Sequence, residues 1–252
     1  MKHFKLNIIV VAVILCIYCI KINPQDSIQI KTKYPFNIGL ATGVTTFALN
    51  DVNELFEDII EVYRQVGFPV KIQRQNPGNI LFQFSASKDL NDNSTIGLRL
   101  QHTWTSSYAL YSDAVGDLDF ISRINISRLD GYYQLNLTER DQDFQVSLQF
   151  IAGLLAFDYN LTTESKVPLV PELNEQSKFY FNKVIPSFEL LVFTKYKIGV
   201  VGITGAAGFR IASTSKVYAT SSLNGEKFDQ GEIELDVTLS GLILSLGMEL
   251  AI

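Results

Sequence analysis

The sequence predicts an all-β protein: a closed antiparallel up-and-down transmembrane β-barrel of about eight strands, with one amphipathic helix in the first long connection. Most of the chain alternates apolar and polar residues with a period of two, which is typical of a strand with one apolar face. Short turns alternate with long connections. The alternation also continues to the last residue, where soluble domains usually fray.

The first 23 residues have the layout of an export signal. Lys2 and Lys5 precede an apolar run from Leu6 to Ile20. This run is shorter than the about 20 residues that a membrane-spanning helix needs. We therefore expect residues 1–23 to be a signal peptide and residues 24–252 to be one barrel domain. The alternative is an uncleaved anchor, because no small-x-small cleavage site is visible.

Charge and cysteine content fit an exported protein that does not bind nucleic acid. Both cysteines, Cys16 and Cys19, lie in the expected signal, so the mature chain would form no disulfide. Removing residues 1–23 takes three of the 21 Lys and Arg and leaves 18 against 26 Asp and Glu, a net charge of about −8. This balance leaves no basic stripe to release phosphate counterions.

The first strand begins near Phe36 and places Phe36, Ile38, Leu40 and Val44 on one face. The segment 51–66 then has apolar residues at helical spacing, from Val52 to Val66. Gly67 followed by Pro69 is expected to end this helix.

Strands resume at Asn79. The segment after Asn79 and the segment from Thr95 to Trp104 are read as one hairpin around the turn 91–93. After a connection at 106–116, further strands are expected at the ranges 117–138, 144–154, 178–194, 196–212 and 232–252. Long connections at 162–177 and 213–231 separate the later ones, and a turn near Lys195 joins two of them.

Two places break the simple alternation. In the segment 117–138 the apolar positions change parity around Asp130 and Gly131, which indicates a bulge in one long strand or a tight Asp-Gly hairpin. We favour the bulge, because two short strands would not each span a bilayer. A second change, around Ser240 and Gly241, also indicates a bulge.

The C-terminal strand, GLILSLGMELAI, places Leu242 and the following even-numbered residues on one apolar face. Its ending resembles the closing strand of bacterial outer-membrane barrels, with Ser245, Gly247, Leu250 and Ile252 at the characteristic positions. Ile252 departs from that pattern, because it replaces the usual aromatic residue. The strand layout is similar to small eight-stranded barrels of the OmpX/OmpW kind. The resemblance implies a location in the bacterial outer membrane, with outer-membrane lipid and the barrel assembly machinery as partners.

The inward faces of such a barrel suggest two groups of site residues. An eight-stranded barrel holds only its own side chains or one small ligand, so charged lumen residues must pair. We expect a lumen polar network of Arg99, Arg123, Glu189 and Glu249. Toward the long connections the inward positions turn apolar, and they form either a contact for the helix or a pocket for a small hydrophobic molecule. This group contains Phe47, Leu81, Ile121, Leu155, Phe157, Phe179 and Phe181.

The function expected from these features is non-enzymatic: a structural or surface protein, or a narrow conduit for small hydrophobic compounds. The sequence indicates no cofactor and no metal site. A lipid-modifying acyltransferase or hydrolase is the first alternative, because His102 lies near Ser106 and Ser107. A soluble secreted lipid-binding barrel is the second, and it requires an apolar lumen and a polar outer surface.

Overall fold

A computed structural model describes most of the chain after the N-terminal segment. The described residues are 35–47, 50–65, 67–74, 79–113, 116–166, 174–212, 215–218, 220–223, 226–228 and 234–252. The expected signal peptide, residues 1–23, lies outside them. Within the described ranges, no helix is both long and apolar enough to cross a membrane.

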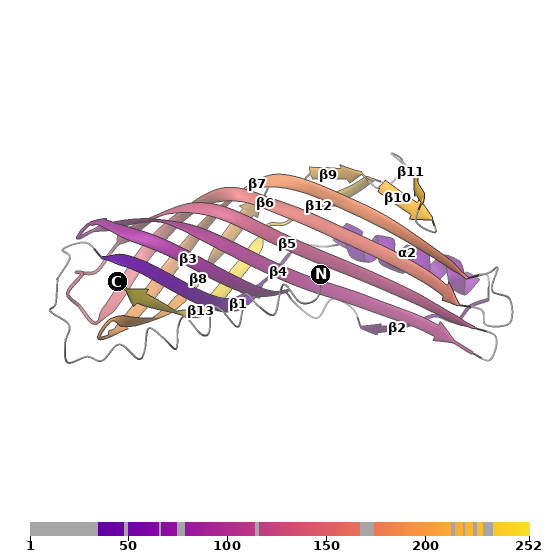
Figure 1. Cartoon of the computed structure of the whole chain (residues 1–252), viewed down its shortest axis with the longest axis horizontal. Helices are drawn as coiled ribbons and strands as arrows, with labels where there is room; N and C mark the ends of the chain where they lie inside the picture. The colour runs from indigo at the N-terminus through magenta and orange to yellow at the C-terminus, as the bar shows by residue number, and fades with distance from the viewer. Residues whose placement is uncertain are drawn as a thin grey trace. The chain divides into compact units, whose positions relative to one another are not determined.

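Eight antiparallel strands close into a ring (Figure 1). Neighbouring strands pair in sequence order from β3 to β8, and the ring closes because β1 pairs with both β3 and β13 while β13 also pairs with β8. The predicted eight-stranded up-and-down barrel is therefore confirmed. Its strands are β1 (Phe36–Thr45), β3 (Asn79–Asn91), β4 (Ser94–Ser112), β5 (Asp117–Asn136), β6 (Phe144–Lys166), β7 (Glu175–Ile198), β8 (Val201–Ala212) and β13 (Gly241–Ala251).

The outer wall of the barrel is apolar. Leu242, Leu246 and Met248 on β13 are 62%, 67% and 62% exposed. Val184 and Phe188 on β7 are each 60% exposed. Inward positions of the same strands include polar or small residues such as Ser187, Glu189, Ser245 and Gly247. We call the outward-facing side chains of β1, β3, β13 and the short-turn halves of β4 to β8 the lipid belt. Apolar outside and polar inside is typical of a membrane barrel and opposite to the expectation for a soluble lipid carrier.

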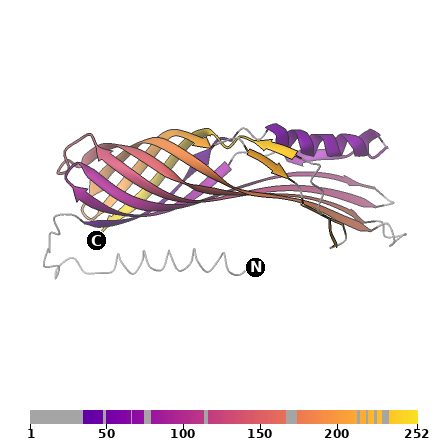
Figure 2. The same cartoon turned by 90° about the horizontal axis from the view of Figure 1, so that it is seen from above.

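Strands β4 to β7 are longer than a membrane crossing requires. They contain 19, 20, 23 and 24 residues, whereas about 9–11 tilted residues cross a bilayer. Their far halves continue beyond the barrel as an extended sheet (Figure 2). β2 (Lys71–Arg74) pairs with β4 at one edge, and β10 (Thr220–Leu223) pairs with β7 at the other, followed by β11 (Glu226–Phe228).

The long connections expected at 106–116 and 162–177 are accordingly shorter than predicted. β4 runs to Ser112, β6 runs to Lys166 and β7 already begins at Glu175. These segments look like loops in the sequence because only one face of the extended sheet is covered, so their other face carries polar residues. The turn expected near Lys195 lies instead at Gly199 and Val200, where Gly199 has a φ of +64°.

A helix lies at the position predicted for it. Helix α2 (Asn50–Gln65) covers the extended sheet (Figure 2). Val52, Phe56 and Ile60 are buried in a core that the sheet shares. The chain leaves the helix through Gly67, whose φ of +100° suits glycine at a helix C-terminus.

The change of parity in β5 has a different cause from the one expected. Its pairing with β4 and β6 is continuous, without a bulge and without a hairpin. Even-numbered side chains point inward throughout: Phe120 and Ile126 face the core under α2, and Asp130 faces the lumen. The apolar face therefore moves from the inside to the outside where the strand enters the lipid belt.

The second expected bulge, around Ser240 and Gly241, is also absent. β12 (Glu234–Val237) pairs with β9 (Ser215–Tyr218) in a separate two-stranded sheet. Residues 238–240 then connect β12 to β13. Leu235, Val237 and Leu239 belong to the core under α2, whereas the apolar face of β13 turns to lipid. The parity change thus marks the passage from that core to the membrane.

Candidate functional site

The middle of the barrel lumen holds a cluster of five buried charged side chains. We call Arg99, Arg128, Arg210, Asp130 and Glu189 the central ion cluster. Each is at most 5% exposed. They come from β4, β5, β7 and β8, and the antiparallel register places Arg99 opposite Asp130 and Glu189 opposite Arg210. Charged residues that are far apart in the sequence therefore meet in a part of the lumen from which water is largely excluded.

The two carboxylates are shared among the three guanidinium groups. Arg99 donates to Asp130 Oδ2 from Nη2 at 2.7 Å and from Nε at 2.9 Å, and it also pairs with Glu189. Arg128 Nη2 lies 2.9 Å from Asp130 Oδ1, and Arg128 pairs with Glu189 as well. Arg210 Nε donates to Glu189 Oε1 at 2.7 Å. Glu189 thus contacts all three arginines.

Two further residues complete the surroundings of the cluster. Gln101 accepts a hydrogen bond from Arg210 Nη2 at 3.0 Å. Gly153 lies opposite Asp130 in the sheet, and a Cβ at this position would collide with the Asp130 carboxylate. The absence of a side chain at residue 153 therefore gives Asp130 the space it occupies.

Apolar side chains fill the lumen beside the ion cluster. Leu81, Ile151, Leu191 and Ile243 form a small buried cluster, against which Tyr132 packs. Leu81 was expected near the helix, but it belongs to this separate group. The central ion cluster and this small cluster together occupy the lumen at this level.

A larger apolar core lies toward the helix. Leu155, Phe157 and Phe181, expected as a helix contact or pocket, are fully buried in the core that also contains the apolar face of α2. Phe179 packs against that core with part of its side chain exposed. Phe47 packs there too, and the Arg210 guanidinium lies 5.2 Å from its ring centroid. This contact joins the core to the central ion cluster.

Tyr63 seals one side of the same core. Its ring meets that of Phe120 edge to face, with centroids 4.9 Å apart. Burial, with the nearby charge of Glu175 as a smaller cause, raises the pKa of Tyr63 above its ordinary value. The phenol is therefore neutral over the physiological pH range.

Two of the expected inward residues face the other way. Ile121 lies on the outer face of β5, and its neighbour Phe120 is the buried residue. Arg123 is exposed on the same outer face. Both errors follow from the assumed break at Asp130 and Gly131, because unbroken alternation along β5 puts even-numbered residues inside.

The sequence reasoning missed Arg128, Asp130 and Arg210. Uninterrupted alternation from Phe120 through Ile126 would have identified Arg128 and Asp130 as lumen residues. Arg210 required the register between β7 and β8, which places it opposite Glu189. Arg99 and Glu189, both predicted, do meet in this cluster.

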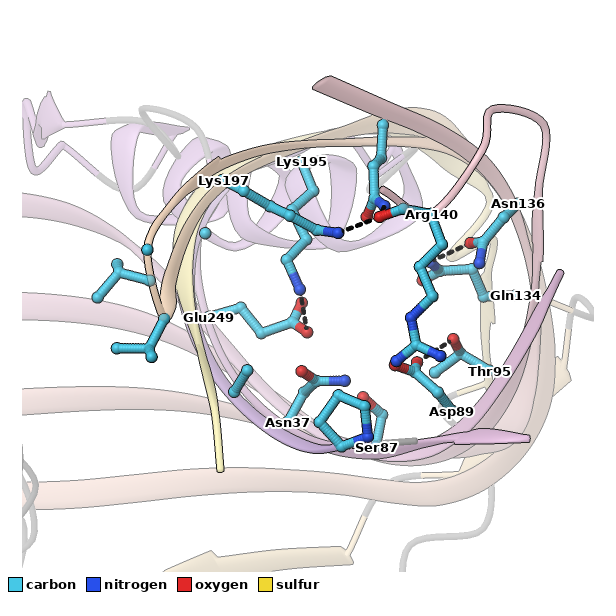
Figure 3. Close-up of a pocket in the computed structure, with 17 residues that line it drawn as sticks. Asn37, Ser87, Asp89, Thr95, Gln134, Asn136, Arg140, Lys195, Lys197 and Glu249 are labelled. Carbon is cyan, nitrogen blue, oxygen red and sulfur yellow. Dashed lines mark hydrogen bonds and ion pairs between the residues drawn. The ribbon is translucent and has the colours of Figure 1, made fainter. Parts of the chain in front are cut away.

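A second polar region lies at the short-turn end of the lumen. A cavity of about 190 Å³ is lined there by Asn37, Ser87, Asp89, Thr95, Gln134, Asn136, Arg140, Lys195, Lys197 and Glu249, among others. Figure 3 shows these side chains pointing into the ring of strands. Glu249, expected in the lumen network, lies here rather than with Arg99 and Glu189.

Ion pairs and hydrogen bonds anchor the charges of this cavity. Lys195 Nζ lies 2.9 Å from Glu249 Oε1 (Figure 3). Gly202 leaves room for the Lys195 stem. Arg140 pairs with Asp89, which also accepts a hydrogen bond of 2.6 Å from Thr95. The cavity is smaller than the about 300–1,000 Å³ typical of small-molecule pockets.

The fold is similar to that of a solved membrane barrel, a major outer membrane protein from Thermus thermophilus. The TM-score is 0.50 at 14% sequence identity, and the match covers 86% of this chain and 99% of that chain. No protein-family model matches the chain, and no curated protein sequence matches it. The likeness concerns the fold: a transmembrane β-barrel.

On the outer wall, His102 has a partner other than the two serines considered from the sequence. His102 Nδ1 lies 2.9 Å from Ser127 Oγ, and both side chains face outward. Ser107 points inward and is buried. Trp104 lies next to His102 at the helix-side edge of the lipid belt, and its ring stacks on that of Phe82 with centroids 5.2 Å apart. Among the described residues, no group of three His, Cys, Asp or Glu side chains could hold a metal ion.

Proposed function

We propose that this chain is a non-enzymatic integral protein of the bacterial outer membrane, whose closed barrel anchors a rigid sheet-and-helix platform at the cell surface. The observation that carries the proposal is the continuity of β4 to β7. These strands cross the lipid belt and continue without a break into the extended sheet. The platform is thus attached by four strands and by no flexible linker within the paired segments.

The packing of the lumen favours this surface role over a narrow conduit for small hydrophobic compounds. The central ion cluster and the apolar cluster around Leu81 occupy the lumen. Beyond them, the core that α2 closes fills the region where an apolar pocket would be needed. A hydrophobic solute would have to pass five buried charges, which is energetically costly.

Two partners belong to the proposal. Outer-membrane lipid would surround the lipid belt. The barrel assembly machinery would engage the C-terminal strand, whose Gly247 and Leu250 occupy positions of the closing-strand pattern. Ile252 replaces the aromatic residue of that pattern, so we expect assembly to be accelerated by Ile252→Phe.

Conductance tests the closed lumen. Purified protein would be inserted into planar bilayers in concentrated KCl, with a large-lumen porin as the positive control. We expect insertion without stepwise current, because salt bridges and packed side chains occupy the lumen. A regular open state of the wild-type chain would contradict the closed-platform proposal and support a conduit.

One observation favours a second candidate, a lipid-modifying enzyme. His102 and Ser127 form a base–hydroxyl pair on the outer wall, where a lipid ester could reach them. If this pair is catalytic, Ser127→Ala and His102→Ala must each abolish turnover of envelope phospholipid in reconstituted vesicles. Equal lipid composition with wild type and both variants would exclude this candidate and leave the pair as part of the belt edge.

A further inference from the structure

The outer wall of the barrel carries a groove that follows one row of paired residues. Its volume is about 1050 Å³, and it crosses β3, β4, β5, β6, β7 and β8. The row runs from Ala86 through Gly131 and Ala152 to Ile211, because the strand register places these residues side by side. Most of its lining side chains are outward-facing members of the lipid belt.

Small residues make part of the floor of the groove, and the larger Leu98 lies between Ala86 and Gly131 in the same row. Gly131 has no side chain, and a Cβ built there would meet no atom within 4 Å. Ala86 and Ala152 lie in the same row. The next row carries the large side chains Tyr133 and Phe150 as one wall. Gly131 therefore creates a depression in the lipid-facing surface and is not required by backbone conformation.

The groove is inclined across the membrane. At its β3 end the groove includes Lys88, which lies close to Asn91, where β3 ends and the short turn to β4 begins. At its other end it includes Ile211, which lies far along β8 from the short turn at Gly199 and Val200. Staggered pairing in a barrel produces this inclination. One end thus lies near the short-turn surface of the membrane and the other lies deep in the lipid belt.

A single charge marks the shallow end. Lys88 is exposed, and among the described outward-facing residues of the lipid belt it is the one Lys, Arg, Asp or Glu side chain. It forms no salt bridge within the described part of the chain. A lysine at the membrane surface attracts the phosphate of an anionic lipid, and its aliphatic stem can lie along apolar atoms.

We propose that this groove is a specific site for one anionic phospholipid of the leaflet at the short-turn side. An acyl chain would lie over Ala86, Gly131 and Ala152, and the headgroup phosphate would contact Lys88. Apolar depth toward the membrane centre, with a cation at the surface end, matches the polarity of such a lipid. The inference rests on the proposed membrane location.

Lipid titration of the full-length protein in detergent, followed by mass measurement of the intact complex, tests the proposal. The probes are dipalmitoyl phosphatidylglycerol and dipalmitoyl glycerol, which has the same chains and no phosphate. We expect one phosphatidylglycerol per wild-type protein. Gly131→Leu and Ala152→Leu, which fill the floor, should each weaken this binding at least about tenfold. Lys88→Gln should weaken it about fivefold and leave dipalmitoyl glycerol binding unchanged.

Ala207→Leu is the matched control, because Ala207 is an exposed lipid-belt residue on β8 outside the groove. Each variant must first show the heat-dependent gel mobility of a folded barrel. Equal lipid binding by the floor variants and Ala207→Leu would overturn the site. A wild-type dimer that dissociates on the Gly131→Leu substitution would also overturn the site. The groove would then bind a second copy of the chain. Either result, from a folded membrane barrel, leaves the proposed function intact.

Discussion

Glu189 is the residue on which the central ion cluster depends most. It is 5% exposed and contacts Arg99, Arg128 and Arg210. With Asp130 as the second acid, two carboxylates face three guanidinium groups, so the cluster has one cation in excess. Buried charges of this kind contribute little net stability as a set, but removing one partner leaves the others uncompensated.

We therefore expect Glu189→Gln to lower the free energy of unfolding by about 3–5 kcal/mol. The glutamine keeps the volume and loses the charge that three arginines share. Urea unfolding in detergent, followed by gel mobility, measures the effect.

Glu249→Gln is the matched control for Glu189. Among the residues that the structure describes, Glu249 pairs with Lys195 alone, and both side chains are partly accessible. Its replacement should cost clearly less, because water can solvate the released lysine. Equal losses for the two variants would show that the central ion cluster has no special energetic role.

Helix α2 joins the extended sheet through one narrow apolar face. Val52, Phe56 and Ile60 recur at helical spacing and are almost completely buried, whereas Val62 on the opposite face is 59% exposed. The extended sheet would otherwise present Phe120, Tyr159 and Phe181 to water. Helix and sheet therefore bury each other's apolar surface outside the lipid belt.

Phe56→Ala should weaken the packing of α2 by about 3–5 kcal/mol, the usual cost of deleting a buried phenyl ring. Hydrogen exchange of the α2 amides measures this change, while gel mobility reports whether the barrel remains folded. Val62→Ala removes a smaller apolar group from the exposed face and should leave exchange almost unchanged. If Phe56→Ala unfolds α2 and the barrel together, the two are one cooperative unit.

The whole molecule has two apolar environments on opposite sides of the same strands. In the extended sheet the apolar face points to α2, and in the membrane it points to lipid. This arrangement places the short turns on one side of the membrane and the platform on the other. By the usual orientation of such barrels, we expect the platform to lie outside the cell.

Cysteine labelling tests that orientation. Lys166→Cys lies at the far end of β6 in the platform, and Asp141→Cys lies in the turn between β5 and β6. A membrane-impermeant maleimide should label Lys166→Cys in intact cells. It should label Asp141→Cys only after the cells are lysed. Cys16 and Cys19 fall in the expected signal, so the unsubstituted mature chain is the unlabelled control. The reverse pattern would place the platform on the periplasmic side.

Much of the barrel could be predicted from local patterns. The alternation beginning at Phe36, the helical spacing after Val52 and the continuous apolar face of Leu242 to Met248 each depend on residues near in sequence. The site was harder to predict. Arg99 and Glu189 were identified as lumen residues, but Arg123 was assigned in place of Arg128 because a change in the environment of β5 looked like a change in its pleat.

The sequence by itself determined which segments alternate, and therefore that the barrel has about eight strands and a helix in the first long connection. Only the tertiary structure decided which side of each strand is inside, that β4 to β7 leave the membrane as an extended sheet, and that Glu189 meets three arginines. Alternation has the same period whether an apolar face packs on lipid or on a helix. The neighbours across the ring, brought together by strand register and closure, distinguish the two.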